Sequence, residues 1–187
     1  EVRPQVCPKL RHGPRVSTWR ASKDAALRGG VCGTHIALAS AMFARANSGT
    51  IIGVDAHPVT VEAYRSQGLP GMSLVGLARG AVRESAVRVR SAISACGFHL
   101  GHFRLVVNLL PAELPKEASA IDLPVAVALL AASGLVPPEA LAGRRFYGEL
   151  SLAGALEPVR GVVLVADLAR RAGDEELLVP CDNTAEA

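Results

Sequence analysis

One loop carries most of the side chains in this sequence that could do chemistry. It runs from Pro111 to Asp122 and contains Lys116 and Ser119. A serine acts as a nucleophile when a base such as lysine or histidine lies within hydrogen-bond distance. The chain has three lysines, and Lys116 is the one that lies outside residues 1–41. One hypothesis is therefore a serine hydrolase in which Ser119 attacks and Lys116 is the base.

The same residues allow two interpretations without a reaction. Ser119 and Asp122 have the spacing of a capping box, and Asp122 alone suits an N-cap because Pro124 then falls in the first turn of the helix that follows. Alternatively, the N-terminus of that helix binds an anion or an acidic peptide, with Lys116 beside it. Capping is the simplest interpretation, and all three stay open at this point.

Several other kinds of site are not indicated. The sequence contains no G-x-x-x-x-G-K-[ST] motif, and no G-x-G-x-x-G motif opens a helix, so neither type of nucleotide-binding loop is predicted. The five histidines are scattered and the four cysteines have no C-x-x-C spacing, so no metal site is predicted. Incidental thiols and the lack of an apolar run that could span a bilayer indicate a cytoplasmic protein without membrane contact.

The net charge of +3 does not by itself indicate a nucleic-acid-binding domain. Residues 1–41 contain seven Lys/Arg and two Asp/Glu, whereas residues 42–187 contain thirteen and fifteen. A basic patch on the second part would therefore have to be local. The candidate is one helix that carries Arg83, Arg88 and Arg90. A solvated helix face is the simpler interpretation, and a face that binds phosphate or a partner is the alternative.

Hydrophobic periodicity predicts the elements that position the loop. An apolar run rich in β-branched residues predicts a strand at 104–110, buried on both faces. After the loop, a segment that is apolar on nearly every face predicts a buried helix from Asp122 to Ser133, which stops at Gly134. Apolar residues at spacings of 4, 3 and 4 predict an amphipathic helix over 79–95.

The rest of the chain is predicted to form shorter elements. A hairpin turn at 55–58 and an antiparallel arrangement of the first three strands are expected. Residues 1–41 are rich in Pro and Gly and have no sustained period, so a disordered tail or an upstream extension is expected there. The other predicted elements are strands at 43–54, 58–64, 72–75, 145–150, 155–159 and 177–179, a helical turn at 137–141, a helix at 161–172 and a final helix capped by Asn183.

Four stretches of the sequence resemble a known family. They are GLPGMSLVGL (68–77), AVRESAVRVRSAISACGF (81–98), VVNLLPAELPKEASAIDLPVAVALLAASG (106–134) and GELSLAGALEPVRGV (148–162). In order and spacing they are similar to the N-terminal domain of the ComM/YifB family of magnesium-chelatase-like AAA+ ATPases. The resemblance covers residues 42–187 and does not cover residues 1–41.

The resemblance implies a fold and two site positions. The N-terminal domain of this family is similar to the catalytic domain of Lon proteases. This similarity implies an α/β (α+β two-layer) fold of the ribosomal-protein type, with a mixed sheet and packed helices. In that pattern Ser119 takes the serine position and Val163 takes the lysine position. Because valine has no proton to exchange, the resemblance implies a degenerate site without the Ser–Lys dyad.

The resemblance therefore implies a module of a larger motor. We expect residues 42–187 to be a non-catalytic N-terminal domain, truncated before the AAA+ domain, that supports oligomerisation or engages DNA or another partner. It implies no cofactor in this chain, ATP and magnesium in the absent AAA+ domain, a hexamer formed through the parent protein, and DNA branch migration in natural transformation. The alternatives are a Ser119-dependent hydrolase of Lon type and an anion- or peptide-binding module near Asp122.

Overall fold

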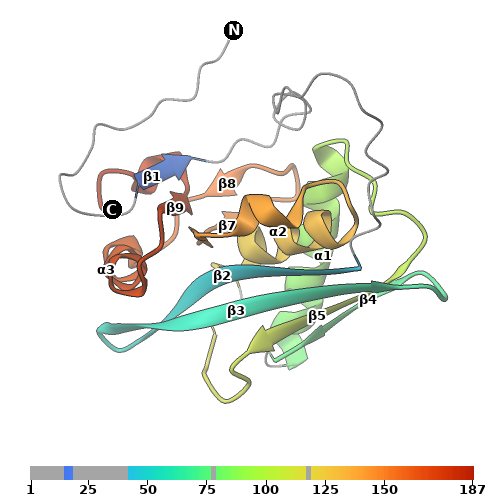
Figure 1. Cartoon of the computed structure of the whole chain (residues 1–187), viewed down its shortest axis with the longest axis horizontal. Helices are drawn as coiled ribbons and strands as arrows, with labels where there is room; N and C mark the ends of the chain where they lie inside the picture. Colours follow the sequence, from blue (N-terminus) through green and yellow to red (C-terminus); the bar gives the residue numbers. More distant parts are fainter. Residues whose placement is uncertain (1–14, 19–41, 77–78, 117–118) are drawn as a thin grey trace, which may run out of the picture.

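A computed structural model describes residues 15–18, 42–76, 79–116 and 119–187 (Figure 1). The strands are β1 (Arg15–Thr18), β2 (Phe43–Ile52), β3 (Asp55–Ser66), β4 (Gly71–Val75), β5 (Arg104–Leu110), β6 (Arg144–Phe146), β7 (Glu149–Leu150), β8 (Leu156–Glu157) and β9 (Glu176–Val179). The α-helices are α1 (Arg79–Ala95), α2 (Asp122–Ala132) and α3 (Val162–Ala172), and the short 3-10 helices are η2 (Pro138–Leu141) and η3 (Cys181–Asn183).

Within the described residues, seven strands form one mixed sheet in the order β1-β9-β6-β2-β3-β5-β4. Strands β7 and β8 form a separate antiparallel pair. Helices α1 and α2 pack together on one face of the large sheet (Figure 1). The α/β class with a mixed sheet and packed helices is therefore confirmed. None of the described helices is long and apolar enough to cross a membrane.

Strand β5 lies inside the sheet, between β3 and β4. It pairs antiparallel with β3 and parallel with β4. The predicted antiparallel start of three consecutive strands is therefore wrong, because β4 reaches the sheet only through β5. A parallel pair needs a long crossover connection, and α1 supplies it between β4 and β5. Burial alternates along β5, with Leu105, Val107 and Leu109 inside, so the prediction of two buried faces is also wrong.

Strands β2 and β3 form a long hairpin whose turn lies earlier than predicted. The turn consists of Gly53 and Val54, and the residues at 55–58 belong to β3. Gly53 has φ +65°, which glycine adopts at little cost in a tight turn. Pro58 is tolerated in the strand because β5 pairs with β3 only from Thr60 onward, so β3 has a single neighbour at that point.

The face of β2, β3 and β5 that points away from α2 carries a chain of polar side chains. Arg45 donates to Glu62 across 2.8 Å, and Asn108 donates to the other carboxylate oxygen of Glu62 across 3.4 Å. The three residues lie opposite one another on adjacent strands. Because the Arg45 side chain is 60% exposed, the ion pair is expected to contribute no more than about 1 kcal/mol to stability.

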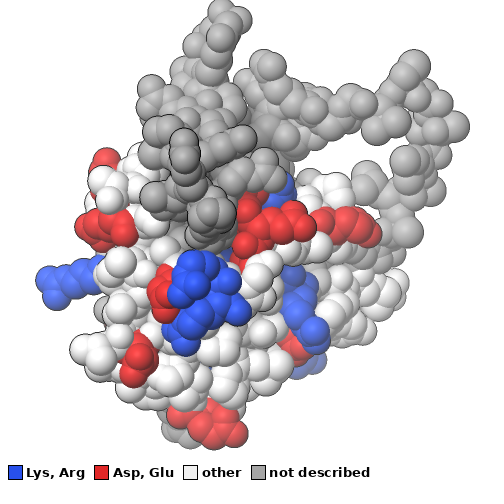
Figure 2. Space-filling view, turned by 60° about the vertical axis from the view of Figure 1, so that its left-hand side comes forward, with Lys and Arg blue, Asp and Glu red and all other residues white. Residues whose placement is uncertain are grey.

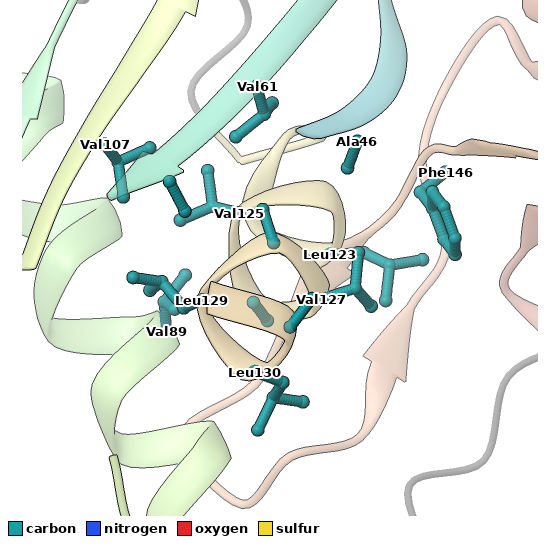
Figure 3. Close-up of a cluster of buried hydrophobic side chains, with 14 of the residues drawn as sticks. Ala46, Val61, Val89, Val107, Leu123, Val125, Val127, Leu129, Leu130 and Phe146 are labelled. Atoms are coloured by element: carbon teal, nitrogen blue, oxygen red, sulfur yellow. The ribbon is translucent and has the colours of Figure 1, made fainter. Parts of the chain in front are cut away.

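Helix α2 is the centre of the main core, and all of its residues are buried. Its side chains meet the sheet, α1 and β6 in different directions (Figure 3). This explains why the segment is apolar on nearly every face, as predicted. The chain leaves the helix through Gly134, which has φ +76°, also as predicted. The labelled side chains around the helix are Ala46, Val61, Val107, Val89 and Phe146.

Helix α3 covers the opposite face of the sheet near β9. Successive side chains of a strand point to opposite faces. In β9, Leu178 joins the core around α2, whereas Leu177 and Val179 pack in the cluster that contains Leu168 of α3. Gly49 of β2 lets α3 approach closely, since a Cβ atom there would lie 3.2 Å from Cδ2 of Leu168. The sheet therefore has a core on each face at this end.

Two features near β9 differ from the sequence predictions. Residues 15–18 form β1, which pairs in parallel with β9, so the irregular tail expected at 1–41 contains a strand. Residues 1–14 and 19–41 lie outside the described residues. Asn183 does not cap a helix. Its side chain bonds instead to the N–H and the carbonyl of Val159, at 2.9 and 2.8 Å, and so ties η3 to the segment before α3.

Gly76→Ala is expected to destabilise the chain by about 3 kcal/mol, because Gly76 combines two kinds of strain. Its φ of +92° disfavours an L side chain, and a Cβ atom would lie 2.5 Å from the backbone oxygen of Leu109. Gly53→Ala is the matched control, since no atom lies within 4 Å of the added Cβ there. We expect that variant to lose about 1 kcal/mol. Urea unfolding measures both, and equal losses would contradict the steric argument.

Candidate functional site

The loop before α2 is fastened by hydrogen bonds to its carbonyl groups. Thr50 of β2 donates its hydroxyl to the Pro115 carbonyl across 2.9 Å. The Lys116 amino group donates to the carbonyls of Leu114, at 3.0 Å, and Pro111. Burial lowers the pKa of Lys116 below its ordinary value. The amine of Lys116 is thus used in hydrogen bonds within its own loop.

Asp122 is the polar residue on which the start of α2 depends. Its side chain is fully buried and faces α1, where it meets Arg88 and Ser85. Nε and Nη2 of Arg88 donate to its two oxygens at 2.7 and 3.3 Å, and the Ser85 hydroxyl donates at 2.7 Å. The N–H of Leu150 in β7 approaches at 3.5 Å. One carboxylate therefore joins α1, α2 and β7.

The positive charge of Arg88 compensates the negative charge of Asp122 in the interior of the protein. Loss of solvent raises the pKa of the Asp122 carboxyl, while the hydrogen bonds from Arg88 and Ser85 oppose that rise. The hydrogen bond with Asp122 in turn raises the pKa of Arg88, so this guanidinium stays charged. A carboxylate with these partners can hold two helices together, but it is not available as a general base for a substrate.

The structure corrects the capping predictions for Ser119 and Asp122. The N-cap residue of α2 is Ile121, and no capping hydrogen bond from a side chain is found there among the described residues. The Asp122 N–H bonds to the Ser119 carbonyl at 3.0 Å, and the Leu123 N–H bonds to the Gly148 carbonyl at 3.0 Å. Pro124 has no N–H. The backbone therefore satisfies the first turn by itself, which leaves these three positions with no donor for an anion.

The candidate site residues are consequently not brought together as one site. The amine of Lys116 bonds to carbonyls of its own loop, whereas the carboxylate of Asp122 bonds to α1. Ser119 is half-buried, and its carbonyl accepts the Asp122 N–H. The neighbouring positions 117 and 118 lie outside the described residues. The geometry fits a structural junction better than a catalytic or anion-binding loop.

The predicted basic face of α1 is divided by the fold. Arg88 turns inward to Asp122 and is not part of a solvated face, so both interpretations of this residue are wrong. Arg90 is exposed. The side chain of Arg83 lies outside the described part of the structure. The three arginines therefore cannot be treated as one patch.

At the end of the molecule that carries α3, positive and negative side chains lie next to each other among the coloured residues (Figure 2). On α3, Asp167 pairs with Arg170 at 2.6 Å and with Arg171 at 2.8 Å. The guanidinium groups lower the pKa of Asp167. Paired charges of this kind do not produce the strong positive field that non-specific binding to nucleic acid requires.

Metal-ligand geometry is not found in the described part of the chain. No group of three or more His, Cys, Asp or Glu side chains there could hold a metal ion. His99 and His102, the histidines nearest to each other in sequence, lie in the exposed loop between α1 and β5. Burial raises the pKa of Cys96, which makes its thiol less reactive.

Comparison with protein families identifies the family of this chain. A family model described as subunit ChlI of Mg-chelatase matches residues 61–183. The chain belongs to this family. The matched residues begin within β3 and end in η3, so they include α1, α2 and the junction at Asp122.

Individual relatives within the Mg-chelatase-like family agree with this assignment. The protein YifB of Salmonella typhimurium is 45% identical over 135 residues, which are 72% of this chain and 26% of YifB. The competence protein ComM of Haemophilus influenzae is 43% identical over 136 residues, which are 73% of this chain and 26% of ComM. The predicted ComM/YifB resemblance is thus confirmed. The chain spans about a quarter of the length of these curated relatives.

The two positions for which the resemblance implied a degenerate site lie at the starts of two different helices in this Mg-chelatase-like chain. Ser119 lies just before α2, and Val163 is the second residue of α3 with its side chain 58% exposed. Their chain neighbours Ala120 and Val162 pack in the same buried cluster. The fold therefore brings these two helix starts to one cluster, but Val163 has neither a base nor a hydrogen-bond donor in its side chain.

Sequence reasoning missed the role of Ser85 and Arg88. The apolar stripe predicted on α1 was Val82, Ala86, Val89 and Ile93. Val89 and Ile93 are buried as predicted, but Ala86 is half-buried and Ser85, which was not in the stripe, is fully buried. Ser85, Arg88, Val89 and Ala92 have the spacing i, i+3, i+4 and i+7 of one helix face. That spacing was a usable signal, since it places a serine and an arginine beside the apolar residues that face α2.

Proposed function

We propose that this chain is a non-catalytic module of a larger Mg-chelatase-like ATPase. The observation that carries the proposal is the use of the Asp122 carboxylate and the Lys116 amine in structural contacts. Asp122 holds Arg88 and Ser85, Lys116 holds its own loop, and Val163 replaces the lysine expected by analogy with Lon proteases. In this proposal the site keeps the architecture of a Lon-type protease, but its side chains join helices and do not cleave peptides.

The residues of this chain do not fit ATP and magnesium. The sequence has no G-x-x-x-x-G-K-[ST] loop to hold phosphates. The described residues also contain no cluster of three or more side chains for a metal ion. We therefore place nucleotide hydrolysis in another part of the longer protein. The limited share of each relative that the chain covers supports this division.

In the longer protein the module would support assembly or engage DNA or another partner. We propose a cytoplasmic homo-oligomer, in the form of a hexamer, that migrates DNA branches during natural transformation. Two findings support this proposal: the match to the Mg-chelatase family and the similarity to a relative named competence protein ComM. The core around α2, in which every residue of the helix is buried, suits a module that transmits or resists force between neighbouring parts.

We expect the 187-residue chain to hydrolyse no ATP and to show no Ser119-dependent labelling by a fluorophosphonate probe. The reason is that Ser119 has no lysine base at position 163 and that the phosphate loop is absent. The comparison variant is Ser119→Ala, measured at the same protein concentration. ATP turnover, or labelling of the wild-type chain that disappears in Ser119→Ala, would contradict the proposal.

A serine hydrolase remains the second candidate, because the neighbours of Ser119 and Val163 share one buried cluster. Val163→Lys tests it directly, since the exposed position should accept lysine with a change in stability within about 1 kcal/mol. We expect the folded variant to remain unlabelled. Labelling that Val163→Lys gains and that Ser119→Ala then removes would show that the lysine alone is missing.

A further inference from the structure

A pocket opens at the C-terminal end of α1. Its volume is about 310 Å³, near the lower limit for small-molecule sites. It shares no lining residue with the junction at Asp122. The lining consists of Arg90, Ile93 and Ser94 from the last turns of α1, followed by Phe98, His99, Leu100, Gly101 and His102 from the loop that leads to β5.

The polar part of the pocket is suited to an anion. Arg90, Ser94, His99 and His102 are exposed side chains that donate hydrogen bonds, and none of the lining residues is acidic. Arg90 has no ion-pair partner among the described residues, in contrast to Arg88 two positions earlier. A guanidinium with free donors is the side chain best matched to a phosphate group.

The other part of the pocket is apolar and fixed. Ile93 is buried in the main core, and Phe98 and Leu100 are half-buried against it. An inorganic ion would make no favourable contact with this apolar surface, whereas the sugar or base of a nucleotide can pack against it. The combination of a basic, hydroxyl-bearing rim and an apolar wall therefore selects an organic phosphate over a bare anion.

The loop that completes the pocket is set by the end of α1. The N–H of Gly97 bonds to the Ser94 carbonyl at 2.9 Å, and the N–H of Phe98 bonds to the Ile93 carbonyl at 3.1 Å. This pattern is a Schellman motif. It satisfies two of the last carbonyls of α1 and so reduces the negative potential that a helix C-terminus presents to an anion.

Gly101 holds the second bend of this loop. It has φ +73°, and a Cβ atom there would lie 2.7 Å from the ring of Phe103. That ring is itself covered by the guanidinium of Arg65, 4.4 Å from the ring centroid. The loop is thus packed on its inner side, which fixes the backbone positions from which its polar side chains extend outward.

We propose that this pocket binds the phosphate of a nucleotide without a metal ion, with the sugar or base against the apolar wall. A free nucleotide and a nucleotide within a single strand share this chemistry. In either case Arg90 binds the phosphate, and Ser94, His99 and His102 donate further hydrogen bonds. If the ligand is a strand, the inference rests on the proposed engagement of DNA by this module. If it is a free nucleotide, the inference goes beyond the proposed function.

The test titrates the 187-residue chain by calorimetry with thymidine monophosphate and, separately, with a short single-stranded oligothymidylate. We expect at least one probe to bind, and Arg90→Gln to weaken that binding about tenfold, as the loss of a charge-assisted phosphate contact predicts. Arg90→Lys keeps the charge but not the fork of donors, so an intermediate loss is expected. Because Arg90 is exposed, the melting temperature should stay unchanged in both variants.

Arg45→Gln is the matched control, since it removes an exposed arginine that is absent from the lining of the pocket. Binding of the monophosphate alone identifies a free nucleotide as the ligand. Binding of the oligothymidylate alone, or much more tightly, identifies a strand. The proposal is overturned if neither probe binds, or if Arg45→Gln weakens binding as much as Arg90→Gln does.

Discussion

Asp122→Ala is expected to lower the free energy of unfolding of this chain by about 3 to 5 kcal/mol, because it removes one partner of a buried ion pair. The guanidinium of Arg88 and the hydroxyl of Ser85 would both lose their acceptor. The Arg88 side chain is 20% exposed, so water can partly replace the carboxylate. We therefore expect the lower half of the range, measured as the shift in the urea midpoint at constant slope.

Two variants show whether the loss comes from the charge or from the contact. Asp122→Asn keeps an oxygen acceptor of similar shape, so it should lose less than Asp122→Ala. Glu62→Ala breaks the exposed pair with Arg45 and should cost no more than about 1 kcal/mol. If Asp122→Ala were no more destabilising than Glu62→Ala, the junction would not be the link that joins α1 to α2.

The parts of the fold that could be predicted from the sequence depend on local patterns. Helix α2 was predicted with nearly its observed bounds, because a segment that is apolar on every face can only be buried and Gly134 marks its end. Strand β5 was placed correctly, but burial on both faces was not. A short apolar run has the same composition whether one or two layers cover it, and the covering layer depends on distant segments.

The order of strands in the sheet required information that periodicity does not contain. Strand β4 was expected beside β3, because strands that follow each other usually pair. The structure instead inserts β5, which is far along the chain and is connected to β4 through α1. The hairpin turn was misplaced for a related reason. Pro58 is a turn former by local preference, and only the single neighbour of β3 at that point makes it acceptable in a strand.

The candidate site illustrates the same limit for side chains. The spacing of Ser119 and Asp122 is local and indicates a capping box. The partner that Asp122 contacts is Arg88, which lies 34 positions earlier in the chain. The Asp122 carboxylate could either cap its own helix or pair with Arg88. It pairs with Arg88 because α1 and α2 bury the sides that face each other. The positions of Ser119 and Val163 at the starts of two different helices came from family resemblance and not from spacing.

A second large effect is expected at the other buried ion pair. Arg145→Met should lower the free energy of unfolding by about 3 to 5 kcal/mol, because it leaves the Asp174 carboxylate buried without its counter-charge. The two side chains are 4% and 8% exposed, and Nε of Arg145 lies 2.6 Å from the carboxylate. Arg145 also donates to the carbonyl of Ser48 in β2. The variant therefore weakens the link between β6, β2 and the turn before β9.

The adjacent Arg144 gives the matched control for this prediction. It pairs with Glu176 at 2.6 Å, but its side chain is 42% exposed and can exchange its partner for water. Arg144→Met should therefore cost only about 1 kcal/mol. Asp174→Ala should resemble Arg145→Met, and the double variant should lose less than the sum of the two, because each single variant already breaks the same pair. Additive losses, or equal losses at positions 144 and 145, would show that burial does not set the strength of this pair.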